Sequence, residues 1–272
     1  MRLMLWIKSK TKHFYRTLLS LSGYELIKLS KYKALVKTDF FGVWDRWAHN
    51  DVSPELLGYI IKNYQKSYSQ LQQDLWALHE YKEKYKSDLN GYFVEFGATD
   101  GRTLSNTFIL EKNYNWKGIL VEPSKSFENS LRTNRNSIID SRCVFSESGI
   151  LVDFNEVEVG ELSGIALHQN LDGWSKHRDR FISYKVKTVT LNDLLLEHNA
   201  PKIINYMSID TEGSEYEILK NFPFERWVIE VLTIEHNFTQ NEVLIEELLI
   251  SQGYRRRIPK TSCWDSWYTL ER

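Results

Sequence analysis

The segment YFVEFGATDG, residues 92–101, constrains the fold of this chain more than any other stretch. It is an apolar run that ends in a glycine-containing loop, which is typical of the first strand and turn of a β-α-β unit. The chain beyond it repeats this alternation of apolar runs and helical patterns, which predicts an α/β fold with a mostly parallel central sheet and helices on both faces. We predict strands at 92–97, 118–122, 142–145, 203–209 and 228–235.

Helical patterns separate most of these strands, with one irregular interruption between residues 147 and 190. Short strands are expected within the interruption, near 150–154 and 185–190. In a sheet of this kind ligands bind at the carboxyl ends of the strands, so polar residues there are the candidates for a site. We predict helices from the glycine loop to about Lys112, from Ser126 to Asn134, from Asn192, from Ser214, and over 241–251.

The chain before the sheet is expected to form a helical N-terminal extension, residues 1–68, and residues 69–272 the main domain. The sequence SPE at 53–55 predicts a capped helix start with proline in the first turn. A second helix is expected over 71–85. This second helix is expected either to close over the ligand crevice or to pack in the core, and both roles fit different faces of it.

Charge is balanced in total but unevenly distributed. The chain has 35 basic and 36 acidic residues, which excludes a general polyanion binder, so no nucleic-acid partner is expected. Residues 1–37 hold nine basic groups and one acid, which leaves the rest of the chain with a net charge of −9. Their apolar residues at 7, 14, 18 and 21 fall near one helical face. Such a helix lies on an anionic membrane or a partner, or else packs on its own domain or on a second subunit of a homo-oligomer.

The two cysteines, Cys143 and Cys263, form no paired motif, which favours a reducing compartment. No apolar run approaches the about 20 residues that span a bilayer. The expected location is the cytoplasm, with residues 1–37 as a candidate peripheral contact with the membrane.

The loop after the first strand lacks one element of a dinucleotide site. Thr99 stands where the G-x-G-x-x-G fingerprint has its middle glycine, so a nicotinamide-dependent oxidoreductase is disfavoured. Gly97 and Gly101 permit a tight turn and close approach of the backbone to a ligand. Glu95 and Asp100 add acids that suit an ammonium group, while N–H groups at the next helix start suit a carboxylate. These features predict an amino-acid moiety as ligand.

Glu122 ends the second strand, in the sequence VEPS, about 20 residues beyond Gly101. An acid at this place accepts hydrogen bonds from ribose hydroxyls in nucleotide-binding folds. An amino acid together with a ribose indicates S-adenosylmethionine. The alternative is that Glu95 and Glu122 are only solvated strand ends.

The chain resembles the FkbM family of S-adenosylmethionine-dependent methyltransferases. The resemblance rests on six motifs in this order: SQLQQDLWAL (69–78), FVEFGATDGRTLSNT (93–107), WKGILVEPS (116–124), ELSGI (161–165), VKTVTLNDLL (186–195) and MSIDTEGSEYEILK (207–220). It implies a Rossmann-like class I methyltransferase fold that usually acts on hydroxyls of sugars or glycan-linked natural products. Thr99 and Thr211 stand where the family often has Asn and Val.

The resemblance also implies a cofactor site, in which Arg142 and Cys143 lie where methyltransferase folds contact adenine. For Cys143 a small buried hydrophobe is the alternative reading. The implied cofactor-binding residues are Glu95, Gly97, Thr99, Asp100, Gly101, Ser105, Glu122, Pro123, Arg142, Cys143 and Asp210.

Two strand ends carry the candidate catalytic residues Asp210, Glu212 and His236. In one mechanism Asp210 or His236 takes the proton of an acceptor hydroxyl during methyl transfer. In the other, Asp210 with Glu235 or His236 holds magnesium or manganese, which lowers the pKa of the hydroxyl. The metal-free mechanism is preferred because no compact ligand cluster is visible in the sequence. His236 bonded to a strand-end carbonyl is the structural alternative.

The irregular segment 161–180 carries candidate acceptor-binding residues, namely Ser163, His168 and Trp174, of which the tryptophan suits stacking on a sugar. The alternative is a surface excursion anchored by one tryptophan. Taken together, the sequence predicts an O-methyltransferase for a saccharide or glycan-linked acceptor. A non-catalytic binding module of the same fold is the rival from a different functional class.

Overall fold

The computed structural model describes residues 40–48, 52–157, 163–166 and 180–271. The N-terminal segment 1–37 and the predicted acceptor-binding residues His168 and Trp174 lie outside the described residues.

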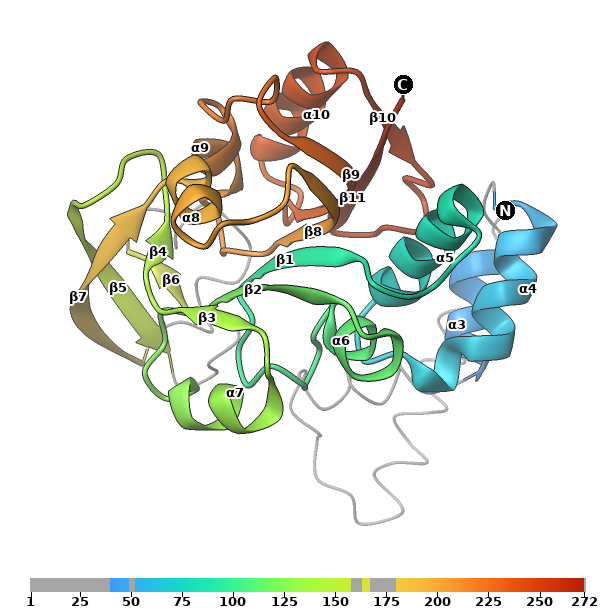
Figure 1. Ribbon diagram of the computed structural model, residues 1–272, viewed down its shortest axis with the longest axis horizontal. Coiled ribbons are helices and arrows are strands. Elements are labelled where there is room, and N and C mark those ends of the chain that lie inside the picture. Colours follow the sequence, from blue (N-terminus) through green and yellow to red (C-terminus); the bar gives the residue numbers. More distant parts are fainter. Residues whose placement is uncertain (1–39, 49–51, 158–162, 167–179, 272) are drawn as a thin grey trace, which may run out of the picture.

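A seven-stranded sheet forms the centre of the molecule (Figure 1). Its strands lie in the order β10-β11-β9-β8-β1-β2-β3. The five strands from β9 to β3 pair in parallel, while β11 pairs antiparallel with both β9 and β10. The strand bounds are β1 Tyr92–Phe96, β2 Lys117–Val121, β3 Ile138–Asp140, β8 Ile203–Ile209, β9 Val228–Glu235, β10 Tyr254–Arg257 and β11 Asp265–Leu270. The predicted mostly parallel sheet is thus confirmed.

A strand occurs at the predicted position 142–145, but it does not belong to the central sheet. The strand next to β2 is β3, Ile138–Asp140, which was not predicted. Residues Cys143–Val144 form β4, which pairs with β7, Phe181–Val189, of a second sheet. Residues 138–144 thus contribute strands to two sheets, a division that the sequence pattern does not reveal.

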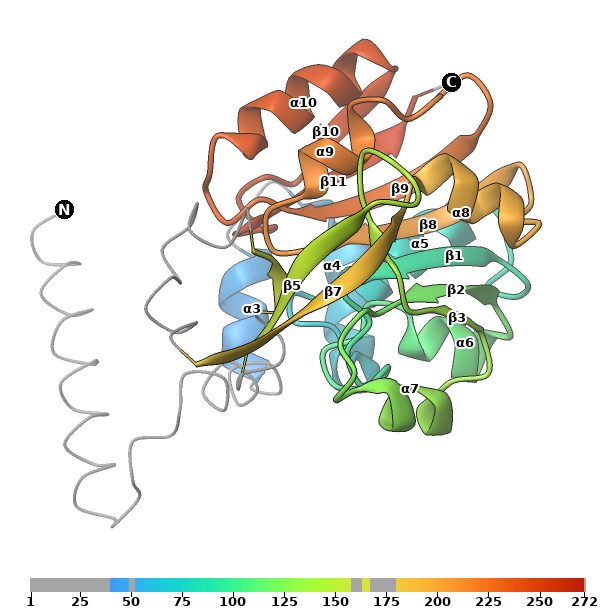
Figure 2. The ribbon, with the colours of Figure 1, turned by 90° about the vertical axis from the view of Figure 1, so that its left-hand side faces the viewer.

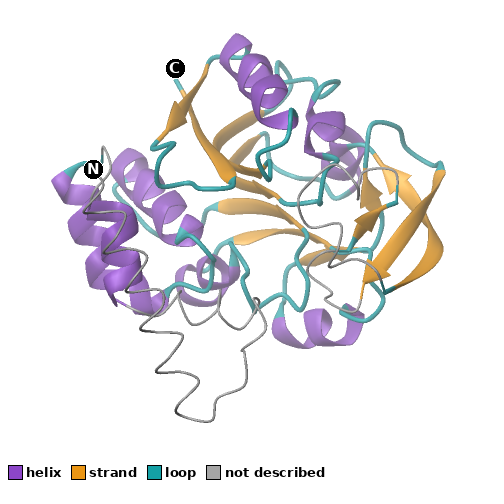
Figure 3. Cartoon of the chain, turned by 180° about the vertical axis from the view of Figure 1, so that it is seen from behind, coloured by secondary structure: helices purple, strands orange, loops and turns teal. Residues whose placement is uncertain are grey.

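The two faces of the central sheet each carry a core. In β1, Phe93 belongs to one cluster of buried side chains, and Val94 and Phe96 belong to the other, as the alternation of a strand requires. Seen from behind, helices lie on both sides of the strands (Figure 3), as predicted. One face packs against α8 Leu191–Glu197, α9 Glu215–Leu219 and α10 Asn241–Ser251. The other packs against α5 Gln73–Tyr85, α6 Phe108–Tyr114 and α7 Glu128–Asn134.

The helices before the sheet join the second of these cores. They are α3 Phe40–Ala48, α4 Pro54–Asn63 and the short 3₁₀ helix η1 Tyr64–Lys66. Ser53 caps α4, because its side chain accepts the backbone N–H of Leu56 at 3.2 Å, and Pro54 follows as predicted. Trp47 of α3 is fully buried against Trp267 of β11.

A smaller sheet projects beside β3, in the order β4-β7-β5-β6 (Figure 2). Its longer strands are β5 Leu151–Val157 and β7 Phe181–Val189, which pair antiparallel near the predicted positions. The short strand β6, Gly164–Ile165, pairs with β5 and carries the second sheet towards the end of β8. None of the helices in the described part of the chain is long and apolar enough to cross a membrane.

Candidate functional site

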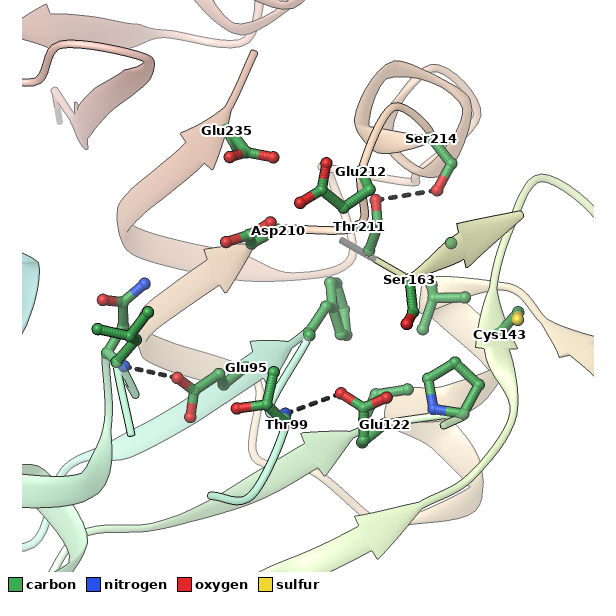
Figure 4. A pocket seen from close by; sticks show the side chains of 18 of the residues that line it. Glu95, Thr99, Glu122, Cys143, Ser163, Asp210, Thr211, Glu212, Ser214 and Glu235 are labelled. Atoms are coloured by element: carbon green, nitrogen blue, oxygen red, sulfur yellow. Dashed lines mark hydrogen bonds between the residues drawn. The ribbon is translucent and has the colours of Figure 1, made fainter. Parts of the chain in front are cut away.

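A pocket lies at the carboxyl ends of β1, β2, β8 and β9, where an α/β sheet is expected to bind its ligands (Figure 4). The second sheet and the loop before α5 complete its walls. The sequence-predicted residues that line it are Glu95, Gly97, Thr99, Glu122, Pro123, Arg142, Cys143, Ser163, Asp210, Glu212 and Glu235. The predicted residues Asp100, Gly101, Ser105 and His236 are not among the lining residues.

Gly97 allows the loop after β1 to approach the loop after β8 at the pocket. Its φ is +71°, and a Cβ at this position would lie 2.2 Å from the carbonyl oxygen of Asp210. Any side chain here would therefore push the loop after β1 away from the loop after β8. The N–H of Gly97 donates to the carbonyl of Val121, which ties the same loop to β2.

Glu122 is buried at the end of β2 and bridges two loops. Its Oε2 accepts the N–H of Thr99 at 2.7 Å, a bond drawn in Figure 4. Its Oε1 accepts the N–H of Ser124 at 2.8 Å. Burial raises the pKa of Glu122 to about 7. The two N–H groups lower this pKa, but their effect is smaller than that of burial. The carboxylate is thus oriented by the backbone and keeps lone pairs for hydrogen-bond donors of a ligand.

Glu95 organises the loop that follows β1. Its carboxylate accepts the side-chain hydroxyls of Ser105 and Thr107 and the N–H of Asn106 at 2.6 Å. The guanidinium of Arg135, which is fully buried, lies 3.5 Å from the same carboxylate. These bonds hold residues 97–107 as an irregular loop.

The helix predicted to begin directly at the glycine loop was therefore wrong in its start, because α6 begins only at Phe108. The carboxylate of Asp100 accepts the N–H groups of Arg102 and Thr103 and stabilises a turn within this loop. Gly101 packs against Leu131 and Arg135, since a Cβ there would lie 2.6 Å from each side chain. Both residues thus shape the loop behind the pocket wall.

Arg142 and Cys143 line the side of the pocket next to the second sheet. Arg142 pairs with Asp140 at 2.6 Å and with Glu197 at 2.7 Å. Burial raises the pKa of the Cys143 thiol to about 12, so the thiol is neutral at physiological pH. Cys143 is therefore suited to packing against an apolar ligand surface and not to nucleophilic chemistry.

Three carboxylates converge where β8 and β9 end. One oxygen each of Asp210, Glu212 and Glu235 lies within 4.8 Å of the others, and Figure 4 shows the three side chains facing one another. Two unit charges at this separation repel by about 3–4 kcal/mol at an effective dielectric constant near 20. Burial raises the pKa of Glu235 well above its usual value, and the neighbouring acids add to the shift.

The turn that carries Glu212 is held by Glu215 of α9. Its Oε1 accepts the N–H groups of Thr211 at 3.1 Å and Gly213 at 2.9 Å. Glu215 therefore has a structural role. Gly164 of β6 lies against this turn, since a Cβ there would come within 3.2 Å of the Glu212 Cβ.

His236 is directed away from the pocket lining. It follows Glu235 at the end of β9, and consecutive residues of a strand point to opposite sides. Its Nδ1 accepts the N–H of Phe238 at 3.0 Å and lies 3.7 Å from Glu242 of α10. Burial lowers the pKa of His236. The structure thus brings Glu212, in place of His236, together with Asp210 and Glu235.

Asp265 is a pocket residue that the sequence analysis missed. It begins β11 directly opposite Glu235 in the register of the two strands. Burial raises its pKa to about 6, and its Oδ2 accepts the Gln73 side-chain amide at 2.9 Å. Gln70 and Gln73 also line the pocket, which places the start of α5 beside the ligand space. No local pattern marks Asp265, because β11 pairs with β9 only through the tertiary fold.

A family profile described as "Methyltransferase FkbM domain" matches residues 95–256. No curated protein matches the chain.

Among solved structures, a variant of MtNAS aligns with a TM-score of 0.34 and 10% identity over 90% of this chain and 78% of that chain. A variant of MtNAS in complex with S-adenosylmethionine aligns with a TM-score of 0.33 and 10% identity over 88% and 77%. A fibrillarin/Nop5p complex aligns with a TM-score of 0.32 and 14% identity over 67% and 73%.

Proposed function

Because the chain belongs to the FkbM family of methyltransferases, we propose that it transfers a methyl group to a hydroxyl oxygen of a saccharide or glycan-linked acceptor. Methyl transfer from S-adenosylmethionine follows from the family. The proposal adds the acceptor class and the accepting atom. Family resemblance supports the saccharide, and the carboxylates of Asp210, Glu212 and Glu235 support an oxygen acceptor.

The pocket residues fit S-adenosylmethionine by their chemistry. Glu122 is oriented to accept ribose hydroxyls, and the loop from Gly97 to Thr99 offers a close backbone surface for the methionine moiety. Arg142 and Cys143 line the space proposed for adenine. The acidic lining complements the positive charges of the ammonium and sulfonium groups. When bound, this cofactor supplies an electrophilic methyl group.

The single observation that carries the proposed chemistry is the carboxylate cluster at the ends of β8 and β9. An alcohol is a very weak acid and stays protonated at neutral pH. Its methylation therefore needs a base or a cation beside the oxygen. A positioned base contributes about 10²–10⁴-fold to the rate. As the oxygen–carbon bond forms, the carbon–sulfur bond breaks to leave a neutral thioether, and the hydroxyl proton passes to a carboxylate or to water.

The proposal is tested by incubating the full-length protein with methyl-labelled S-adenosylmethionine and a panel of saccharides and glycans. Mass spectrometry should find one added methyl group that is stable to mild base, as an ether is and an ester is not. Asp210→Asn should reduce label transfer far more than it reduces cofactor affinity measured by calorimetry.

His236→Ala serves as the comparison, because His236 lies outside the pocket lining but was predicted as a base. Loss of turnover in this variant alone would place the base at His236 and not in the carboxylate cluster. Binding of S-adenosylmethionine without turnover on any hydroxyl acceptor would instead favour a non-catalytic module.

A further inference from the structure

We propose that Asp210, Glu212 and Glu235 bind one divalent cation of the magnesium or manganese type. The three carboxylates come from the loop after β8, the turn before α9 and the end of β9, and one oxygen of each lies within 4.8 Å of the others. An all-oxygen donor set is the one that these cations prefer. The inference concerns the pocket of the proposed methyl transfer, yet it is tested without knowing the acceptor.

Glu235 supplies a second, independent observation. Its Oε2 is shielded from solvent and has no hydrogen-bond partner among the described residues. Figure 4 shows this carboxylate directed towards Glu212. A buried carboxylate oxygen without a partner is costly, and a bound cation would satisfy it.

Three other acids of the pocket have partners for their carboxylates, which sets the Oε2 atom of Glu235 apart from them. Glu95 lies 3.5 Å from the Arg135 guanidinium, and Glu122 accepts two backbone N–H groups. Asp265 accepts the amide of Gln73 at 2.9 Å. The guanidinium of Arg142, another residue of the pocket lining, bridges Asp140 and Glu197.

Contacts around the loop after β8 hold Asp210 and Glu212 in place. Glu215 fixes the turn before α9 through the N–H groups of Thr211 and Gly213. Gly164 lies against Glu212, and Gly97 lies against the carbonyl of Asp210. A preformed arrangement of this kind lowers the cost of gathering like charges when the cation binds.

A cation held by three carboxylates retains coordination positions for water and for an acceptor oxygen. It would lower the pKa of the bound hydroxyl, so that a weak base or water suffices to take the proton. The competing explanation is that the cluster faces the positive charges of S-adenosylmethionine and binds no metal.

The test is a titration of the full-length, cofactor-free protein with Mn²⁺, in which electron paramagnetic resonance measures the free ion. We expect one saturable Mn²⁺ per chain that Mg²⁺ displaces. Asp210→Asn and Glu235→Gln should each weaken this binding about tenfold or more. Mutation of residues that only hydrogen-bond to metal ligands already lowers metal affinity about 10–100-fold. Glu217→Gln is the matched control, because Glu217 lies outside the pocket lining and pairs with Lys220 at 2.7 Å.

Thermal unfolding provides a readout that is independent of turnover. Mn²⁺ should raise the Tm of the wild type and of Glu217→Gln but leave that of Glu235→Gln almost unchanged, since a ligand of the folded state stabilises it by mass action. Near-native far-UV circular dichroism of each variant checks that it folds. Should one substitution prevent folding, the other carries the comparison.

Two results would overturn the cation site. One is the absence of saturable Mn²⁺ binding; the other is equal binding by the wild type, Asp210→Asn and Glu235→Gln. Loss of S-adenosylmethionine affinity in both variants, with no Mn²⁺ binding by the wild type, would assign the cluster to the cofactor. Mn²⁺ binding without methylation of any saccharide would support the cation site and remove only the proposed acceptor.

Discussion

Gly97 is the residue at which the backbone itself limits substitution. Its φ is +71°, and an added Cβ would meet the carbonyl oxygen of Asp210 at 2.2 Å. We expect Gly97→Ala to lower the free energy of unfolding by at least about 1–2 kcal/mol, the cost of a left-handed conformation for a residue with a Cβ. It should also weaken S-adenosylmethionine binding, since the loop after β1 must move. Urea unfolding and calorimetry measure the two effects.

Gly58→Ala is the control for this substitution. Gly58 lies within α4, and an added Cβ there would meet nothing within 4 Å. Alanine in a helix interior is favoured over glycine by about 0.5–1 kcal/mol, so this variant should be more stable than the wild type. Equal stabilities of the two variants would contradict the close approach of Gly97 to Asp210.

Glu122 makes stability depend on pH. Its folded-state pKa of about 7 lies above the usual value of 4.5, because burial disfavours the charged form. The folded state therefore binds more protons than the unfolded state between these pKa values. The stabilising contribution is complete below about 4.5 and is lost as the pH rises through about 7.

We expect the cofactor-free wild type to lose roughly 1 kcal/mol of unfolding free energy between pH 6 and 8 relative to Glu122→Gln. Taking this difference cancels the opposite contribution of His236, whose pKa is lowered by burial. Urea unfolding at several pH values measures it, and parallel profiles of the two proteins would refute the raised pKa. The same variant should bind S-adenosylmethionine more weakly, since a hydrogen bond to a charged group contributes about 1.5–3 kcal/mol.

At the scale of elements, α3 is joined to the sheet through aromatic side chains. Trp47 is fully buried, its ring centroid lies 5.8 Å from that of Trp267 in β11, and its Nε1 donates to Gln72 at 3.1 Å. Trp76 of α5 stacks on the same Trp267, with ring centroids 4.9 Å apart. The predicted boundary at residue 68 therefore separates segments that share a core.

We expect Trp47→Ala to lower the free energy of unfolding by about 3–5 kcal/mol, as for other buried aromatic residues. Trp44→Ala, on the same helix but with 41% of the side chain exposed, should cost less than about 1 kcal/mol. Urea unfolding of both variants tests this. If both variants lose a similarly small amount of unfolding free energy, α3 contributes little to the stability of the domain. The residues before the boundary at 68 would then be an extension that the main domain does not need for folding.

At the scale of the whole molecule, charge separates the N-terminal segment from the remainder. Residues 1–37 carry nine basic groups and one acid, while the remaining chain carries 26 basic and 35 acidic groups. We propose that this segment contacts anionic membranes, where each basic side chain near the surface contributes about 1 kcal/mol. Deletion of residues 1–37 should reduce sedimentation with phosphatidylserine-containing vesicles and leave S-adenosylmethionine affinity unchanged.

Neutral phosphatidylcholine vesicles are the control for this experiment. Because they carry no net charge, neither the full-length protein nor the deletion variant should sediment with them through electrostatic attraction. If both forms sediment equally with anionic vesicles, the segment instead packs on its own domain or on a second subunit.

The local sequence determined the position of those strands and helices whose own residues carry a clear apolar or helical pattern. The apolar runs of β8 and β9 and the helical pattern of α10 were predicted with the bounds that the structure has. The placement of Glu122 at a strand end also followed from the sequence, because the residue after an apolar run emerges at the edge of the sheet.

Tertiary structure decided what depends on partners distant in the chain. The antiparallel strands β10 and β11 were missed because β11 pairs with β9 and β10 pairs with β11, and only the tertiary fold brings these strands together. The late start of α6 reflects the bonds of Glu95 to residues 105–107. The cluster of Asp210, Glu212 and Glu235 exists only because parallel strands end side by side, while strand alternation turns the neighbouring His236 away. Sequence names the residues near a strand end, but only packing decides which of them face one another.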